Sequence, residues 1–325
     1  MKRITGIILV FALVFSLCSC SGGKTEGAPL TVNGTPVDGE VFRYFLNEAW
    51  NDKTVSGRDA RIQKATELCI RYVAVNSTFT TSGLRLTQAQ KNESGSRSNV
   101  LWNMFGKFYE SIGVSKQTFV KIQLSGQYTE VLRLAYFDKG GPDEISDAAL
   151  RGYFREYYAA FRMISAPLSK TDVYGEKQEL TEEERKTIED SYSRSAGQFN
   201  AGTSFDDICK MLATDVSASQ EALETLVISP DDTEFSEAFY NSVRSVDEGK
   251  AGLFEDGEFI YLINRVDILS DPALFEKYRD ECLLSASEIP LQSKINIMCN
   301  SYTSKRNSSL MGDYYREMAG VKGNG

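Results

Sequence analysis

The spacing of apolar residues divides the chain into a helical first part, a mixed middle part and a helical last part. Residues 58–137 carry apolar side chains at intervals of three and four positions, which predicts a series of helices. Within this region the polar stretch 92–98 predicts a break between two helices. After Pro272 the helical spacing resumes and continues to Met318. We therefore expect helices at both ends of the folded body.

Short strands and short helices alternate in the middle part. We expect strands at 161–168, 225–228 and 258–266. Helices are expected to begin near Thr181, Ser204 and Phe235. Thr181 and Glu184 have the spacing of a capping box, and Asp256-Gly257 is a turn pair that joins 252–255 to the last strand. This order predicts an α+β fold, in which an α+β domain is inserted between two parts of a helical domain.

A hairpin is expected where the folded body begins. Asn33-Gly34 separates the β-prone pieces 30–32 and 35–37, and both turn residues suit the positive φ angles of a tight hairpin. Asp38 follows, with an oxygen acceptor suited to cap a helix. The apolar face expected for that helix contains Val41, Phe42, Phe45 and Leu46.

The N-terminus has the features of a secretory signal. Lys2 and Arg3 precede an apolar run, 7–17, which is shorter than the roughly 20 residues that span a bilayer. The segment Leu17-Cys18-Ser19-Cys20 resembles a bacterial lipobox, which implies removal of residues 1–19 and lipidation of Cys20. Residues 20–29 would then be a tether that holds the protein on the extracytoplasmic face of the cell membrane. An ordinary secreted protein is the alternative.

Composition excludes several kinds of chemistry. The chain has no histidine, which excludes Ser-His-Asp and Cys-His catalysis and histidine-ligated metals. The cysteines beyond the lipobox are Cys69, Cys209, Cys282 and Cys299. None forms a Cys-x-x-Cys pair, so we expect no metal and no cofactor, and we interpret these cysteines as small buried side chains. A disulfide between Cys282 and Cys299 stays open.

The formal net charge of -9 bears on possible partners. Nucleic acid is not expected as a partner of a chain with this charge. The same charge argues against adhesion to anionic lipid beyond the anchor itself.

Four short motifs stand in order along the chain. They are Val32-Asn33-Gly34 with Val37 and Phe42, Ile145-Ser146-Asp147 with Leu150 and Phe154, Phe199-x-x-Gly202-Thr203-Ser204-Phe205, and Phe235 with Phe239 and Gly249. Together they resemble the PrsA and SurA family of extracytoplasmic foldases. The resemblance implies a SurA-like helical domain at 30–158, completed by 271–320. It also implies a parvulin-like prolyl isomerase domain at 159–270, with a small antiparallel sheet flanked by helices, and unfolded exported polypeptides as partners.

The chain departs from this family at its catalytic positions. Active parvulins have two core histidines, which would fall near Ile164 or Ser165 and near Phe259 or Ile260 here, and the glycine-rich segment expected within 216–226 is absent. Ser165 and Phe259 are the remaining catalytic candidates, although Ser165 also fits an ordinary strand serine. Phe235 and Phe239 would hold the proline ring, with Met211 or Met163 nearby. Core packing is the alternative for the two phenylalanines.

Three functions are compatible with these observations. The first is a membrane-anchored chaperone that holds unfolded polypeptides, with weak or no isomerase activity. Its client cleft would use aromatic residues of the helical domain, most of which we also expect in the core: Trp50, Trp102, Phe105, Phe108 and Tyr109. The second is an active isomerase with a histidine-free site. The third is a surface lipoprotein with a dedicated protein partner. The oligomeric state stays open.

Overall fold

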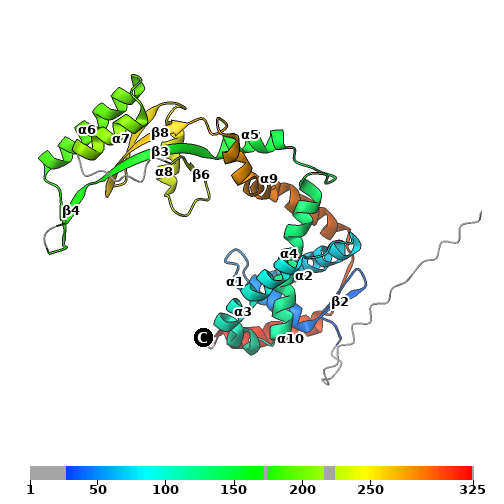
Figure 1. Cartoon of the computed structure of the whole chain (residues 1–325). Coiled ribbons are helices and arrows are strands. Elements are labelled where there is room, and N and C mark those ends of the chain that lie inside the picture. The colour runs from blue at the N-terminus through cyan, green and yellow to red at the C-terminus, as the bar shows by residue number, and fades with distance from the viewer. Residues whose placement is uncertain (1–26, 172–173, 216–223, 324–325) are drawn as a thin grey trace, which may run out of the picture. The chain divides into compact units, whose positions relative to one another are not determined.

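The computed structural model describes residues 27–171, 174–215 and 224–323. The predicted signal peptide, lipobox and lipidated Cys20 lie outside these residues. The chain divides into two compact units, each made of separate segments (Figure 1). Within the described residues, unit 1 comprises 27–73, 98–122 and 302–323, and unit 2 comprises 74–97, 123–171, 174–215 and 224–301. The N-terminal and C-terminal segments therefore belong to one unit.

Unit 1 begins with the predicted hairpin. Asn33 and Gly34 have φ angles of 48° and 82°, as a tight two-residue turn requires. A third strand from the C-terminal segment pairs with the hairpin, which the sequence did not predict, and all pairings are antiparallel. The sheet order is β2-β1-β9, with β1 (Leu30–Val32), β2 (Thr35–Val37) and β9 (Ser304–Arg306).

Helices complete unit 1. Asp38 caps α1 (Gly39–Asn51) by accepting a 2.8 Å hydrogen bond from the amide of Glu40, as predicted. The helix α10 (Ser308–Gly323) and parts of α2 (Arg58–Thr81), α3 (Gln88–Ser111) and α4 (Lys116–Phe137) belong to the same unit. Their core includes Phe42, Leu46, Ala65, Cys69, Phe119 and Met311.

The predicted break at 92–98 is wrong, because α3 runs through it without interruption. Asn92, Glu93 and Arg97 are exposed, so their polarity reflects a solvated helix face. Ser94 and Ser98 are 7% and 0% exposed and lie one helical turn apart on the buried face. Because serines occupy the buried face here, this part of α3 lacks the apolar spacing by which a helix is predicted.

Unit 2 contains a four-stranded antiparallel sheet in the order β6-β3-β8-β7. The strands are β3 (Ala159–Pro167), β6 (Leu226–Ile228), β7 (Ala251–Glu255) and β8 (Phe259–Val266). The helices α6 (Glu182–Asn200) and α7 (Phe205–Asp215) share a core with one face, and α8 (Glu237–Ser245) shares a core with the other. A two-stranded ladder, β4 (Ser169–Thr171) with β5 (Lys177–Glu179), was not predicted. The α+β prediction is confirmed, with a small antiparallel sheet between helical segments.

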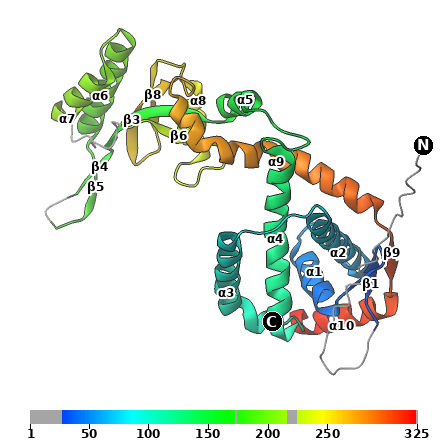
Figure 2. The ribbon, with the colours of Figure 1, turned by 45° about the vertical axis from the view of Figure 1, so that its right-hand side comes forward.

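A second core of unit 2 is helical. It packs α5 (Asp147–Tyr157) and α9 (Pro272–Ser301) with the unit 2 parts of α2 and α4. Figure 2 labels these four helices. The long α9 includes Pro290. Across the described residues, every helix is too short or too polar to cross a membrane.

The cysteines bear out the sequence interpretation in part. Cys69, Cys209 and Cys282 are buried, whereas Cys299 is partly exposed. All four are free thiols, so the disulfide left open between Cys282 and Cys299 is not formed.

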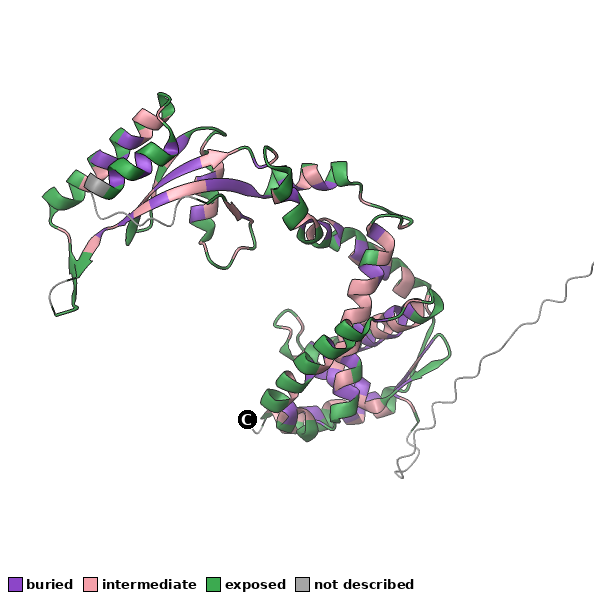
Figure 3. Cartoon of the chain, viewed as in Figure 1, coloured by how far each residue is buried: buried purple, intermediate pink, exposed green. Residues whose placement is uncertain are grey.

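Figure 3 shows that buried residues in unit 2 concentrate along the central strands and the faces of the helices that cover them.

Candidate functional site

Most of the predicted site residues lie on one face of the central sheet in unit 2. Strand alternation places Phe161, Met163 and Ser165 of β3 on the face that α8 covers. Antiparallel pairing adds Phe259 opposite Pro167 and Tyr261 opposite Ser165. We name this surface the aromatic face, and its six rings are Phe161, Phe235, Phe239, Phe254, Phe259 and Tyr261.

Phe239 is at the centre of the aromatic face. Its ring stacks on Phe235, with 4.7 Å between centroids and an interplanar angle of 16°. It also meets the ring edges of Phe161 at 5.6 Å and Tyr261 at 5.2 Å. Phe239 is only 3% exposed and Phe161 is fully buried, whereas Phe235 is half-buried. Phe235 and Phe239 therefore form a pair that belongs to the core, and the half-buried Phe235 is its accessible side.

A polar group borders this apolar surface. The hydroxyl of Tyr261 donates a 2.8 Å hydrogen bond to Asp256, in the turn before β8. Partial burial alone would raise the pKa of Asp256, but hydrogen bonds from the Phe259 amide, the Tyr261 hydroxyl and the Glu258 amide lower it below its usual range. Burial and the carboxylate beside it raise the pKa of Tyr261. The hydroxyl therefore stays protonated at neutral pH, and the site has an ionised acceptor and a neutral donor.

Met211 is not brought to the aromatic face. It lies on α7, whose buried residues Ile208 and Leu212 pack with Ile164 on the opposite face of the sheet. The Met211 side chain is 39% exposed. Met163, the other methionine considered, does pack in the aromatic cluster.

The accessible part of the aromatic face suits contact with an apolar or prolyl group. Phe259 is 36% exposed, and its ring lies 6.1 Å from that of Tyr261. Rotation about a prolyl bond breaks no covalent bond, so a surface that favours the twisted amide needs no proton transfer. Ser165 and Tyr261 place hydroxyl groups on this face. The arrangement is compatible with recognition of a proline ring. Because Phe239 and Phe161 are buried, they limit how deeply such a ring can enter the surface.

A second surface lies in unit 1, on α3. Val100, Met104 and Phe105 are 58%, 67% and 47% exposed; Val100 and Met104 lie one helical turn apart on the same face, and Phe105 follows Met104 round the helix. Beside them, Leu101 and Phe108 are half-buried against the unit 1 core. We name Val100, Met104 and Phe105 the α3 stripe.

The α3 stripe was only partly foreseen. Among the aromatic residues considered for a client cleft, Trp50, Trp102, Phe108 and Tyr109 pack against the core and Phe105 is exposed. Met104 and Val100 were missed as surface residues. Apolar spacing shows that a helix has an apolar face, but it does not show where the neighbouring helices stop covering that face.

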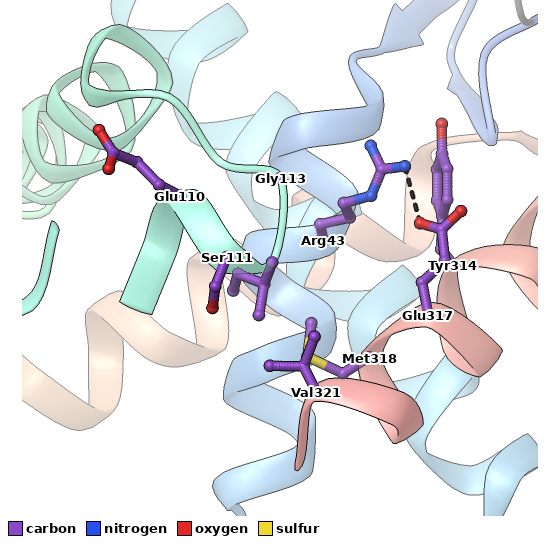
Figure 4. Close-up of a pocket in the computed structure, with 9 residues that line it drawn as sticks. Arg43, Glu110, Ser111, Gly113, Tyr314, Glu317, Met318 and Val321 are labelled. Atoms are coloured by element: carbon purple, nitrogen blue, oxygen red, sulfur yellow. Dashed lines mark hydrogen bonds and ion pairs between the residues drawn. The ribbon is translucent and has the colours of Figure 1, made fainter. Parts of the chain in front are cut away.

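Unit 1 also has an open pocket of about 370 Å³, which Figure 4 shows. Arg43 from α1 pairs with Glu317 from α10 at 2.9 Å, and its guanidinium lies 3.8 Å from the centroid of the Tyr314 ring. Ile112, Met318 and Val321 contribute apolar lining. The pocket was not predicted, because its walls come from segments far apart in the sequence.

Comparisons with known proteins give low similarities. No family model matches the chain, and no curated protein matches it. Similar solved structures include the foldase protein PrsA from Streptococcus pneumoniae, with 12% identity, a TM-score of 0.35, and coverage of 85% of this chain and 88% of that chain. PrsA from Lactococcus lactis has 11% identity and a TM-score of 0.35, with coverage of 89% and 99%. A SurA-like chaperone from Campylobacter jejuni has 10% identity and a TM-score of 0.32, with coverage of 86% and 99%. The chain is structurally similar to PrsA foldases and SurA-like chaperones, at TM-scores too low to carry a functional argument.

Proposed function

We propose that this chain is a membrane-anchored, extracytoplasmic folding helper that holds unfolded exported polypeptides. The observation that carries the proposal is the α3 stripe, three large apolar side chains exposed within two turns of one helix. A group of exposed apolar side chains commonly marks a place where another molecule binds. Unfolded polypeptides expose apolar side chains before they fold, so they are suitable occupants of such a surface.

The composition of the stripe suits many different clients. Met104 is an unbranched thioether with three rotatable side-chain bonds, and such side chains adapt to apolar groups of varied shape. Phe105 adds a large flat surface, and Val100 extends it along the helix. Because α3 is packed against the unit 1 core through Leu101 and Phe108, the stripe has a rigid support. Binding of this kind needs no fixed client sequence.

The proposed location follows from the N-terminal sequence. A lipid on Cys20 would hold the folded body where exported chains emerge, within reach of its clients. Membrane attachment and export belong to this proposal together with client binding.

Suppression of aggregation tests the proposal. The chain from Ser21 onward would be mixed with several unrelated proteins as they refold from denaturant, and light scattering would be recorded. We expect suppression by the wild-type chain and a several-fold weaker effect for Met104→Ser/Phe105→Ser. The matched control is Ile289→Ser/Ile297→Ser, which removes two apolar side chains that are 81% and 68% exposed on α9. Equal suppression by both variants would remove the α3 stripe from the proposal.

Prolyl isomerisation is the second candidate function. The observation that favours it is the shared position of Ser165, Phe235, Phe239 and Phe259 on the aromatic face. Such an activity would work by ring contact and exclusion of water, because the chain has no histidine.

A further inference from the structure

The charges of the chain are unevenly divided between the two units. The described residues of unit 1 contain 13 Lys and Arg against 9 Asp and Glu. Those of unit 2 contain 20 Lys and Arg against 33 Asp and Glu. The chain total of -9 therefore hides a basic unit and a strongly acidic one. Exposed charges more than about 10 Å apart are largely screened at physiological ionic strength, so the local sign decides what a surface attracts.

Two of the basic residues stand at the edge of the unit 1 sheet. Lys305 and Arg306 are in β9, where every residue is exposed. Within the described part of the chain, neither side chain has an ion pair or a hydrogen bond. Their charges are therefore available to an external anion.

This basic strand lies where the folded body begins. β9 pairs along β1, with Lys305 opposite Thr31 and Arg306 opposite Leu30, and Figure 2 shows the two strands side by side. The amide of Asn307 donates a 2.9 Å hydrogen bond to the carbonyl of Pro29, immediately before β1. Lys305 and Arg306 are thus held next to the residue at which the chain passes from the predicted tether into the sheet.

A third basic side chain of unit 1 lies against the helix that follows β9. A Cβ built on Gly312, in the helix that follows β9, would lie 2.5 Å from a guanidinium nitrogen of Arg58. The guanidinium of Arg58 therefore packs against α10, although Arg58 as a whole is exposed to solvent.

We propose that the β9 edge, Lys305 and Arg306, binds the anionic headgroups of the membrane that carries the anchor. The inference rests on the proposed lipidation of Cys20. Leu30 lies ten positions after Cys20, and a segment of that length spans at most about 35 Å. The anchor would thus keep the basic strand near the lipid surface, where each basic residue strengthens binding to anionic lipid about fivefold. Contact at β9 would fix how unit 1 faces the membrane.

An acidic polypeptide could also satisfy two cations. We favour the membrane over an acidic polypeptide because Lys305 and Arg306 lie beside β1, where the predicted tether ends. The proposed client surface, the α3 stripe, is on a different element. The net charge of the whole chain argued against adhesion to anionic lipid beyond the anchor. The proposed contact is narrower than general adhesion, because it involves one edge of unit 1 only.

Flotation with lipid vesicles tests the proposal. The chain from Ser21 onward, which has no lipid, would be mixed at low salt with vesicles of phosphatidylcholine, with and without one third phosphatidylglycerol. We expect binding only to the anionic vesicles, weakening as salt is added. Lys305→Gln/Arg306→Gln should bind about 25-fold more weakly, because two cations near the surface are lost. The matched control is Lys186→Gln/Lys250→Gln, which makes the same charge change at exposed positions of unit 2 and should bind as the wild type does.

Other results would overturn the proposal. Binding that ignores phosphatidylglycerol, or that falls equally in both variants, would exclude a specific role for β9. Binding to soluble polyglutamate without binding to vesicles would identify an acidic polypeptide as the partner instead. The β9 hydrogen bonds are made by the backbone, so both variants should keep the sheet, and circular dichroism would check this. The assay contains neither client nor anchor, so it can fail while client holding and lipidation stand.

Discussion

The carboxylate of Glu40 binds Ser115, the residue immediately before α4. One of its oxygens accepts hydrogen bonds from the Ser115 amide at 3.0 Å and the Ser115 hydroxyl at 2.5 Å. Glu40 itself lies in the first turn of α1. A single side chain therefore joins the N-termini of two helices of unit 1, where a negative charge is also favoured by the helix dipoles.

The Glu40 contact predicts a pH-dependent contribution to stability. Partial burial by itself would raise the pKa of Glu40, but hydrogen bonds from Ser115 and Thr118 and the charge of Arg43 bring it below its ordinary value of 4.5. A carboxylate with a lowered pKa stabilises the fold above the unfolded pKa and loses that effect as pH falls through the folded pKa. We expect Glu40→Gln to lower the free energy of unfolding by about 1–2 kcal/mol at pH 7. The difference should shrink below about pH 4.5, in urea titrations at several pH values. A difference that does not change with pH would contradict the account, and Glu110→Gln is the control at an exposed carboxylate.

Two buried tyrosines should respond in opposite ways to loss of the hydroxyl. Tyr192 is fully buried in unit 2, and its hydroxyl has no hydrogen-bond partner within the described residues. Tyr158 is 3% exposed, and its hydroxyl donates a 2.9 Å hydrogen bond to Glu281. Tyr192→Phe should stabilise the protein by about 1 kcal/mol, and Tyr158→Phe should destabilise it by about as much. Urea unfolding measures both, and loss of stability in both variants would show that the Tyr192 hydroxyl has a partner.

The burial of the aromatic face predicts weak or absent isomerase activity. Phe239 and Phe161 are buried inside the cluster, so a proline ring could meet only the edges of the partly exposed rings, which in the described residues are Phe235, Phe254, Phe259 and Tyr261. NMR would measure cis/trans exchange in a panel of Xaa-Pro peptides. We expect the exchange to keep its uncatalysed time scale of tens of seconds. Acceleration that Phe235→Ala abolishes and Met211→Ala leaves intact would instead establish the second candidate function, because Met211 lies on the other side of the sheet.

Lipidation at Cys20 predicts membrane attachment. The expressed full chain should fractionate with membranes, and mass spectrometry of its N-terminal peptide should show a diacylglyceryl group on this cysteine. Cys20→Ala should move the protein out of the membrane fraction. A soluble wild-type chain with an unmodified Cys20 would support the ordinary secreted alternative.

Local patterns predicted much of the fold. The Asn33-Gly34 turn, the Asp38 cap and the capping box of Thr181 with Glu184 all depend on neighbouring residues, and the structure contains each of them. The pairing of β9 with β1 was missed, because it joins ends of the chain that share no local signal. The break at 92–98 failed for a related reason, since the buried face of α3 contains serines.

The candidate site was less accessible to sequence reasoning. The resemblance to parvulins brought Ser165 and Phe239 to one site, but neither it nor the spacing of apolar residues shows how much of each side chain remains exposed. Met104 has helical apolar spacing like its buried neighbours, and only the tertiary arrangement leaves it at the surface. Exposure depends on which elements cover a face, and this is a property of the whole fold.

Photo-crosslinking on α3 tests the central claim most directly. A photoreactive phenylalanine analogue would replace Phe105 in one variant and Ile289 in another, both at exposed apolar positions on long helices. Each variant would be irradiated with several unrelated unfolded polypeptides and with their folded forms. We predict crosslinks from position 105 to the unfolded polypeptides, few from position 289, and none to the folded forms. Equal crosslinking at both positions, or none at 105, would contradict client binding at the α3 stripe.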